Sequence, residues 1–250
     1  MKTAANLSVL WPDLPYLDRF EAAAQAGFDG VEVLFPYDMP AKETQRALLR
    51  MGLSMVLLAA PPPNYTGGAR GFAAVPEAAD RFKYDLRRAI RYCQALRVPV
   101  LQILVGAAQG DAAHDTLVQN LKAAAEVAPK GLLITISPSN PIDLPGSFLD
   151  SYDLAAEVLH AVDAPNVALQ FNTYEAAVLH GDPIAVLEQH AKLIRHVHVA
   201  DPPEGEADIQ ALYVGLYDIA YDGWVGVACD ANAAPEQHLE RMRPLRGQTA

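Results

Sequence analysis

Short apolar runs alternate with longer amphipathic stretches along the whole chain. The short runs are rich in Val, Ile and Leu, which is typical of parallel strands that are buried on both faces. Eight runs fit this description: 4–10, 30–34, 54–59, 100–105, 132–137, 167–172, 195–200 and 225–229. Helical periodicity follows each run, over 14–26, 41–51, 77–96, 116–128, 152–162, 183–193, 209–220 and, more weakly, 235–245.

Eight strands that alternate with eight helices predict one α/β domain over residues 1–250, a (β/α)8 or TIM barrel. Boundary residues agree with this division, because Asp182-Pro183 can cap a helix and Gly27 and Gly52 stand where helices should end. The alternative is a doubly wound open sheet. That fold usually carries a glycine-rich phosphate turn after its first strand, whereas the chain here reads Leu-Trp-Pro-Asp.

Composition narrows the function classes. The 250 residues are 51% hydrophobic and 20% charged, which predicts a folded domain with a full core. The formal net charge of -11 opposes binding to phosphate backbones, so we expect no nucleic-acid partner. No apolar run approaches the roughly 20 residues that span a bilayer, and the two cysteines, Cys93 and Cys229, cannot build a disulfide framework. We therefore expect a soluble cytoplasmic protein that binds no membrane.

Polar side chains gather at the carboxyl ends of the predicted strands. In such barrels these ends form the face that carries the active site. Residues two positions apart on a strand point to the same face, so Thr135 lies on one face with Ser137, and His196 with His198. The full set of interest also includes Asn6, Glu32, Tyr37, Gln102, Gln170, Asn172, Asp201 and Asp230. Two interpretations remain open: a binding or catalytic site, or a polar layer that satisfies its own hydrogen bonds. The longest stretch without predicted regular structure is 60–76, which includes Arg70. A loop of this length is typical of a lid or binding loop.

Several segments resemble the hydroxypyruvate isomerase family, which belongs to the xylose isomerase-like barrels. They are Ala-Asn-Leu-Ser at 5–8, Ala-Gly-Phe-Asp-Gly-Val-Glu at 26–32, Leu-Phe-Pro-Tyr-Asp at 34–38, Gly-Ala-Arg-Gly at 68–71, His-Val-His-Val-Ala-Asp at 196–201 and Tyr-Asp-Gly-Trp-Val-Gly at 221–226. The resemblance implies a barrel that interconverts hydroxypyruvate and tartronate semialdehyde through an enediolate. It also implies a divalent cation on oxygen ligands that stabilises the developing oxyanion.

The chain departs from this family at each expected cation ligand. The family has Glu, Asp, Gln and Glu after strands five to eight, where this sequence has Ser137, Asn172, His198 and Asp230. One carboxylate remains of three, which should weaken Mg²⁺ or Mn²⁺ binding by several orders of magnitude. We therefore expect no cofactor, or a weakly held Mg²⁺, Mn²⁺ or Zn²⁺. For Zn²⁺, His198 and Asp230 together with Glu175 are the candidate ligands.

Two hypotheses for the function follow. In the first, the chain is an isomerase with weak or altered activity on a small hydroxy-carbonyl or sugar-like ligand. Its catalytic positions are Asp230, His198 and Ser137, and a metal-free proton shuttle would pair His198 or His196 with Asp230 or Glu32. The expected ligand contacts are Asn6, Glu32, Tyr37, Arg70, Gln102, Asn172, His196 and Asp201. In the second, the protein is a non-catalytic descendant that binds such a ligand or a partner subunit. The resemblance also implies a homo-oligomer.

Overall fold

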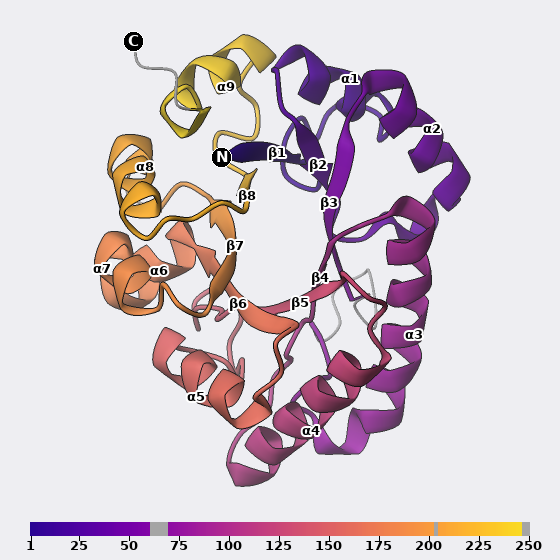
Figure 1. The fold of residues 1–250 in the computed structure, drawn as a ribbon, viewed down its shortest axis with the longest axis vertical. Helices are drawn as coiled ribbons and strands as arrows, with labels where there is room; N and C mark the ends of the chain where they lie inside the picture. Colours follow the sequence, from indigo (N-terminus) through magenta and orange to yellow (C-terminus); the bar gives the residue numbers. More distant parts are fainter. Residues whose placement is uncertain (61–69, 203–204, 247–250) are drawn as a thin grey trace.

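Eight parallel strands form a closed barrel in which each strand pairs with the next and β8 pairs with β1 (Figure 1). The computed structural model describes residues 1–60, 70–202 and 205–246. The strands are β1 Lys2–Asn6, β2 Gly30–Glu32, β3 Ser54–Ala59, β4 Val100–Gln102, β5 Leu133–Ile136, β6 Val167–Asn172, β7 Ile194–Val199 and β8 Trp224–Val227. The predicted (β/α)8 barrel is therefore confirmed.

Helices surround the barrel on its outside (Figure 1). They are α1 Asp18–Gln25, α2 Ala41–Met51, α3 Ala79–Leu96, α4 Asp111–Val127, α5 Tyr152–Val162, α6 Thr173–His180, α7 Pro183–Gln189, α8 Ile209–Asp218 and α9 Pro235–Arg241. Short 3-10 turns add Pro36–Asp38, Pro76–Ala78 and Pro244–Arg246. Within the described ranges, no helix is both long and apolar enough to cross a membrane.

The predicted helix ends that rest on capping chemistry are confirmed. Gly52 takes a left-handed conformation and ends α2, and Gly27 also has a positive φ, of 73°. Asp182 begins α7 by accepting hydrogen bonds from the backbone amides of Ile184 and Ala185. These ends follow from residue type alone, which explains why the sequence locates them.

Other boundaries were predicted wrongly. The first strand ends at Asn6, not at residue 10, because the amides of Val9 and Leu10 turn back to the Asn6 carbonyl. The fourth helix begins at Asp111, five residues earlier than expected. Helix α6 was not predicted, because residues 173–182 were left as a connection between the strand at 167–172 and the helix at 183–193. Residues 61–69 of the predicted lid lie outside the described part of the chain.

The two faces of the barrel strands differ in polarity. Ile134, Ile136, Phe171 and Val197 are fully buried in the apolar core, as their spacing predicted. The alternate residues of the same strands are polar, and they too are buried: Thr135, Gln170, His196 and His198. Because consecutive side chains on a strand point to opposite faces, these polar groups occupy the barrel interior.

Candidate active site

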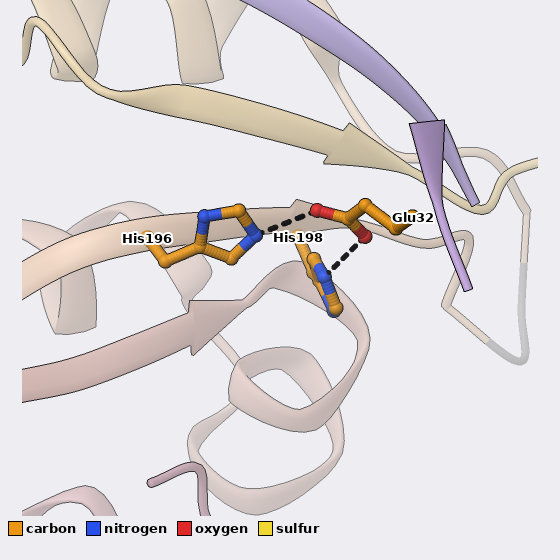
Figure 2. A group of neighbouring side chains, drawn as sticks. All are labelled: Glu32, His196 and His198. Carbon is orange, nitrogen blue, oxygen red and sulfur yellow. Dashed lines mark hydrogen bonds and ion pairs between the residues drawn. The ribbon is translucent and has the colours of Figure 1, made fainter. Parts of the chain in front are cut away.

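A polar network crosses the interior of the barrel. Its centre is Glu32 at the end of β2, whose Oε1 accepts a hydrogen bond of 2.7 Å from Nε2 of His196 on β7 (Figure 2). The other carboxylate oxygen, Oε2, lies 2.7 Å from Nε2 of His198, within ion-pair distance. The side chains of Glu32 and His196 have no exposed surface, and only 8% of the His198 side chain is exposed. The carboxylate is thus buried with two imidazoles as its partners.

Two further side chains extend this network to β5 and β6. The amide nitrogen of Gln170 lies 3.1 Å from Nδ1 of His198, and the hydroxyl of Thr135 donates to Oε1 of Gln170 at 3.1 Å. In this orientation Gln170 donates to Nδ1, so the ring proton of neutral His198 sits on Nε2 and faces Glu32. Nδ1 of His196 is buried and has no hydrogen-bond partner among the described residues.

The network fixes the charge on its members. Burial by itself would raise the pKa of Glu32, but attraction to His198 and His196, together with their hydrogen bonds, lowers it to about 2. Burial lowers the pKa of His196, and the nearby Glu32 carboxylate offsets this only in part. At neutral pH the interior therefore holds an ionised Glu32 beside a neutral His196.

These shifts predict that acid destabilises the fold. In the folded protein the pKa of His196 is lower than its usual 6.5. As the pH falls below 6.5, His196 of the unfolded chain therefore takes up a proton before His196 of the folded protein does, which favours unfolding. The lowered pKa of Glu32 acts in the same direction, because below pH 4.5 the unfolded chain protonates this carboxylate before the folded protein does. Urea unfolding at pH 7, 5.5 and 4 should show a progressive loss of stability. Below pH 4.5 the free energy of unfolding should fall more in the wild type than in Glu32→Gln. Equal losses of stability in the two proteins would contradict a lowered pKa of Glu32 in the folded protein.

A second polar group surrounds a cavity at the carboxyl ends of β4 and β5. The cavity has a volume of about 100 Å³, and its polar lining includes Arg70, Gln102, Ser137, Ser139, Asp143 and Glu175. Oε2 of Glu175 accepts hydrogen bonds from the backbone amide and the side-chain amide of Asn140, at 2.7 and 2.9 Å. Three of the predicted site residues, Arg70, Gln102 and Ser137, therefore line one cavity.

Other predicted site residues have structural partners. Asn172 caps α6 by accepting from the amides of Tyr174 and Glu175. The hydroxyl of buried Tyr37 donates to the carbonyl of Ala59. A third residue, Asn6, is also buried, and its side-chain oxygen accepts from the amide of Ser8 at 3.1 Å. Each of these three side chains forms a hydrogen bond with a backbone group, local for Asn172 and Asn6 and 22 residues away for Tyr37.

The last two predicted residues lie toward α9. Asp201 forms an ion pair with Arg241 and accepts from the backbone amides of Ala207 and Asp230. The side chain of Asp230 is exposed and borders a different groove, together with His238 and Arg241. The structure therefore does not bring Asp230 into the cavity that Ser137 lines.

A family model described as a xylose isomerase-like TIM barrel matches residues 20–245. The chain belongs to this family. The resemblance that the motifs indicated is confirmed, since curated relatives at about one-third identity include isomerases of hydroxypyruvate and of 2-oxo-tetronate.

Relatives of this xylose isomerase-like barrel match it over almost their whole length. The 2-oxo-tetronate isomerase of Pectobacterium atrosepticum is 34% identical, and the match covers 97% of both chains. The hydroxypyruvate isomerase of Escherichia coli is 33% identical over 98% of this chain and 100% of its own. A solved structure titled AP endonuclease, family 2, from Brucella melitensis has a TM-score of 0.90 at 34% identity and covers 97% of this chain and 98% of its own.

The expected cation ligands of this xylose isomerase-like barrel do not form one cluster. Asn172 caps a helix, His198 contacts Glu32 in the interior and Asp230 borders another groove. The Zn²⁺ set proposed from the sequence, His198 with Asp230 and Glu175, is likewise not brought together. These residues do not fit an oxygen-rich Mg²⁺ or Mn²⁺ site.

One group in the described ranges has the residue types and spacing to hold a metal ion. It consists of Glu32, His196 and His198, whose ligand atoms all lie within 4.8 Å of one another. An ion there would have to replace the ring protons that now face the carboxylate. The triad is therefore compatible with weak metal binding.

The sequence indicated Glu175 only as a candidate Zn²⁺ ligand with His198 and Asp230, and not as a neighbour of Arg70, Gln102 and Ser137 in one cavity of this xylose isomerase-like barrel. The signal was available in the local sequence, since Asn172 is a preferred helix cap and Glu175 follows it by three residues. Reading this as the start of a helix would have placed Glu175 in the first turn after β6. That turn lies on the side of the barrel where the active site of this fold is found.

Proposed function

We propose that this protein binds a small hydroxy-carbonyl compound at the carboxyl ends of its barrel strands, and that metal-dependent isomerisation is weak or lost. The proposal rests on one observation: the residues at the four expected cation-ligand positions do not form an oxygen-rich cluster. Two of them, Ser137 and Asn172, are neutral, and the carboxylate of Asp230 borders a separate groove. A cation bound there would supply charge stabilisation for the enediolate, and these residues do not offer it the cluster of carboxylates that the family has.

Ligand binding is supported by the lining of the cavity. Arg70 supplies a guanidinium for an anionic group, and Gln102 and Ser137 supply hydrogen-bonding groups for hydroxyl and carbonyl oxygens. The relatives named hydroxypyruvate isomerase and 2-oxo-tetronate isomerase support a small hydroxy-carbonyl acid as the ligand. A protein that keeps this lining but not the cation ligands fits a binding protein or a metal-independent isomerase.

Weak metal binding by Glu32, His196 and His198 is a second candidate. Two imidazoles favour Zn²⁺ over Mg²⁺, because nitrogen ligands suit the softer ion. The triad is buried, and Nε2 of both imidazoles already lies 2.7 Å from the Glu32 carboxylate, so we propose that it holds an ion only weakly. The native role of the triad in this proposal is the metal-free network that crosses the barrel.

Calorimetric titration of metal-stripped protein with Mn²⁺, with and without hydroxypyruvate, tests the proposed function. We expect no saturable Mn²⁺ binding below millimolar concentrations, and hydroxypyruvate binding that Mn²⁺ does not change. A parallel Zn²⁺ titration of the wild type and His196→Gln probes the triad. One-site Mn²⁺ binding at micromolar concentration, accompanied by isomerisation of hydroxypyruvate, would overturn the proposal.

A further inference from the structure

The cavity at the carboxyl ends of β4 and β5, here named the mouth cavity, contains a carboxylate, that of Glu175, to which the resemblance to known isomerases gives no role. We propose that Glu175 is the acid–base residue of this cavity and moves a proton on the carbon next to the carbonyl group of a bound hydroxy-carbonyl ligand. The inference rests on the proposed function, since it needs a ligand of that class in the cavity. It concerns the same site and gives one residue a chemical role there.

The first turn of α6 places Glu175 at the cavity. Asn172 ends β6, and its side-chain oxygen accepts from the amides of Tyr174 and Glu175 at 2.9 and 3.4 Å. This cap fixes the direction in which the chain leaves the barrel. Glu175 then lines the cavity together with Ser137, which follows the neighbouring strand β5, and Gln102, which ends β4 one strand further along the sheet.

Asn140 orients the carboxylate of Glu175. Both hydrogen bonds that Glu175 accepts from Asn140 fall on Oε2. Asn140 is itself fully buried, and its side-chain oxygen accepts from the amides of Ile142 and Asp143, both at 3.0 Å. No hydrogen bond to Oε1 of Glu175 is found among the described residues. One oxygen is therefore anchored while the other can meet a ligand.

The surroundings of Glu175 favour proton transfer at neutral pH. Burial raises its pKa, and the hydrogen bonds from Asn140 offset this only in part. A carboxylate with a raised pKa is a stronger base than an exposed one, and its acid form persists closer to neutrality. Ser137, at the position where the family has Glu, carries a hydroxyl that is not a base at this pH without an activating neighbour.

The other carboxylate of the cavity is a weaker candidate. Asp143 accepts hydrogen bonds from the Tyr174 hydroxyl and from the side-chain amide of Asn140. These two contacts lower its pKa, and the guanidinium of Arg70 lowers it further. A carboxylate stabilised in this way is a poorer base, so the two acidic groups of the cavity have different expected roles.

The proposed step needs no oxidant, reductant or second substrate. Glu175 takes a proton from the carbon that bears the hydroxyl group. The electron pair of that C–H bond forms a carbon–carbon double bond, and the former carbonyl oxygen gains the negative charge. Return of the proton to the same carbon regenerates the ligand, and its delivery to the neighbouring carbon, with movement of the hydroxyl proton, gives the isomer. In heavy water the first route replaces hydrogen by deuterium.

Proton NMR of hydroxypyruvate in heavy water tests this inference. The measured quantity is the loss of the C3 proton signal above the protein-free rate, for the wild type, Glu175→Gln, Asp143→Asn and the exposed control Glu188→Gln. Glu175→Gln keeps an oxygen to accept from Asn140. We expect it to exchange at least about 100-fold more slowly than the wild type, with a hydroxypyruvate Kd within about threefold by calorimetry. We expect exchange by Glu188→Gln at the wild-type rate.

The outcomes separate this inference from the proposed function. Wild-type protein that binds hydroxypyruvate without promoting exchange would overturn the inference and leave the proposed binding in place. The inference would also be overturned if Glu175→Gln exchanged at the wild-type rate, or if Asp143→Asn alone lost exchange. Wild-type protein that binds no hydroxypyruvate would overturn the proposed function, and the inference with it. Thermal melting of each variant checks that its fold is intact.

Discussion

Replacing Glu32 with alanine is expected to lower the free energy of unfolding by about 3–5 kcal/mol. The carboxylate is wholly buried, and both of its oxygens lie 2.7 Å from an imidazole nitrogen, of His196 and of His198. Its removal leaves Nε2 of His196 without its acceptor, takes the nearby carboxylate away from His198 and opens a cavity inside the barrel. Urea unfolding at pH 7, followed by circular dichroism, measures the loss.

Two variants serve as controls for this prediction. Glu188→Ala removes an exposed carboxylate from α7 and should change stability by no more than about 0.5 kcal/mol. Glu32→Gln retains one acceptor oxygen, so its loss should fall between those of the two alanine variants. A loss below 1 kcal/mol for Glu32→Ala would mean that the imidazoles find other partners in the folded protein.

Gly71→Ala is expected to lower stability by about 2–5 kcal/mol and to weaken ligand binding at the mouth cavity. Gly71 has a φ of 94° and pairs with Val105 in an isolated bridge between the segments that follow β3 and β4. A Cβ atom there would lie 2.1 Å from the carbonyl oxygen of Leu104. Backbone cannot move aside as a flexible side chain can, so the two segments must separate. Neighbouring Arg70 would move with them.

Gly52→Ala is the matched control for this substitution. Gly52 has a φ of 68°, but a Cβ atom there would meet nothing within 4 Å. It should therefore show only the penalty for the left-handed backbone, about 1–2 kcal/mol. Urea unfolding of both variants, with hydroxypyruvate titration of the folded proteins, separates strain from steric overlap. Equal stability losses in the two variants would show that the close approach to Leu104 contributes nothing.

The barrel could be predicted because each of its repeating units is encoded locally. Alternation along one strand was enough to place His196 and His198 on the face opposite Val197, inside the barrel. The contact of both rings with Glu32 could not be predicted in the same way. It depends on the shear of the closed sheet, which brings β2 across from β7, and no spacing within either segment carries that information.

The acidic residues near α9 show a second limit. Asp201 and Asp230 both follow strands, and the sequence therefore placed them in the site. In the structure Asp201 binds Arg241, which comes from the weakest of the predicted helices. Since that helix packs back against the barrel, the partner of Asp201 lies 40 residues away in the sequence. Residue type identifies a charged side chain, but distant packing decides which group neutralises it.

The pairing of Glu32 with His196 also has a consequence for folding during synthesis of the chain. The two residues are 164 positions apart, so a ribosome adding about 5–20 residues per second makes His196 roughly 8–33 s after Glu32. During that interval the nascent chain carries a carboxylate that the finished barrel buries, but not yet the imidazoles that accompany it. Burial of that carboxylate without partners is unfavourable. Closing the barrel around Glu32 is therefore more favourable once β7 has left the ribosome than before it.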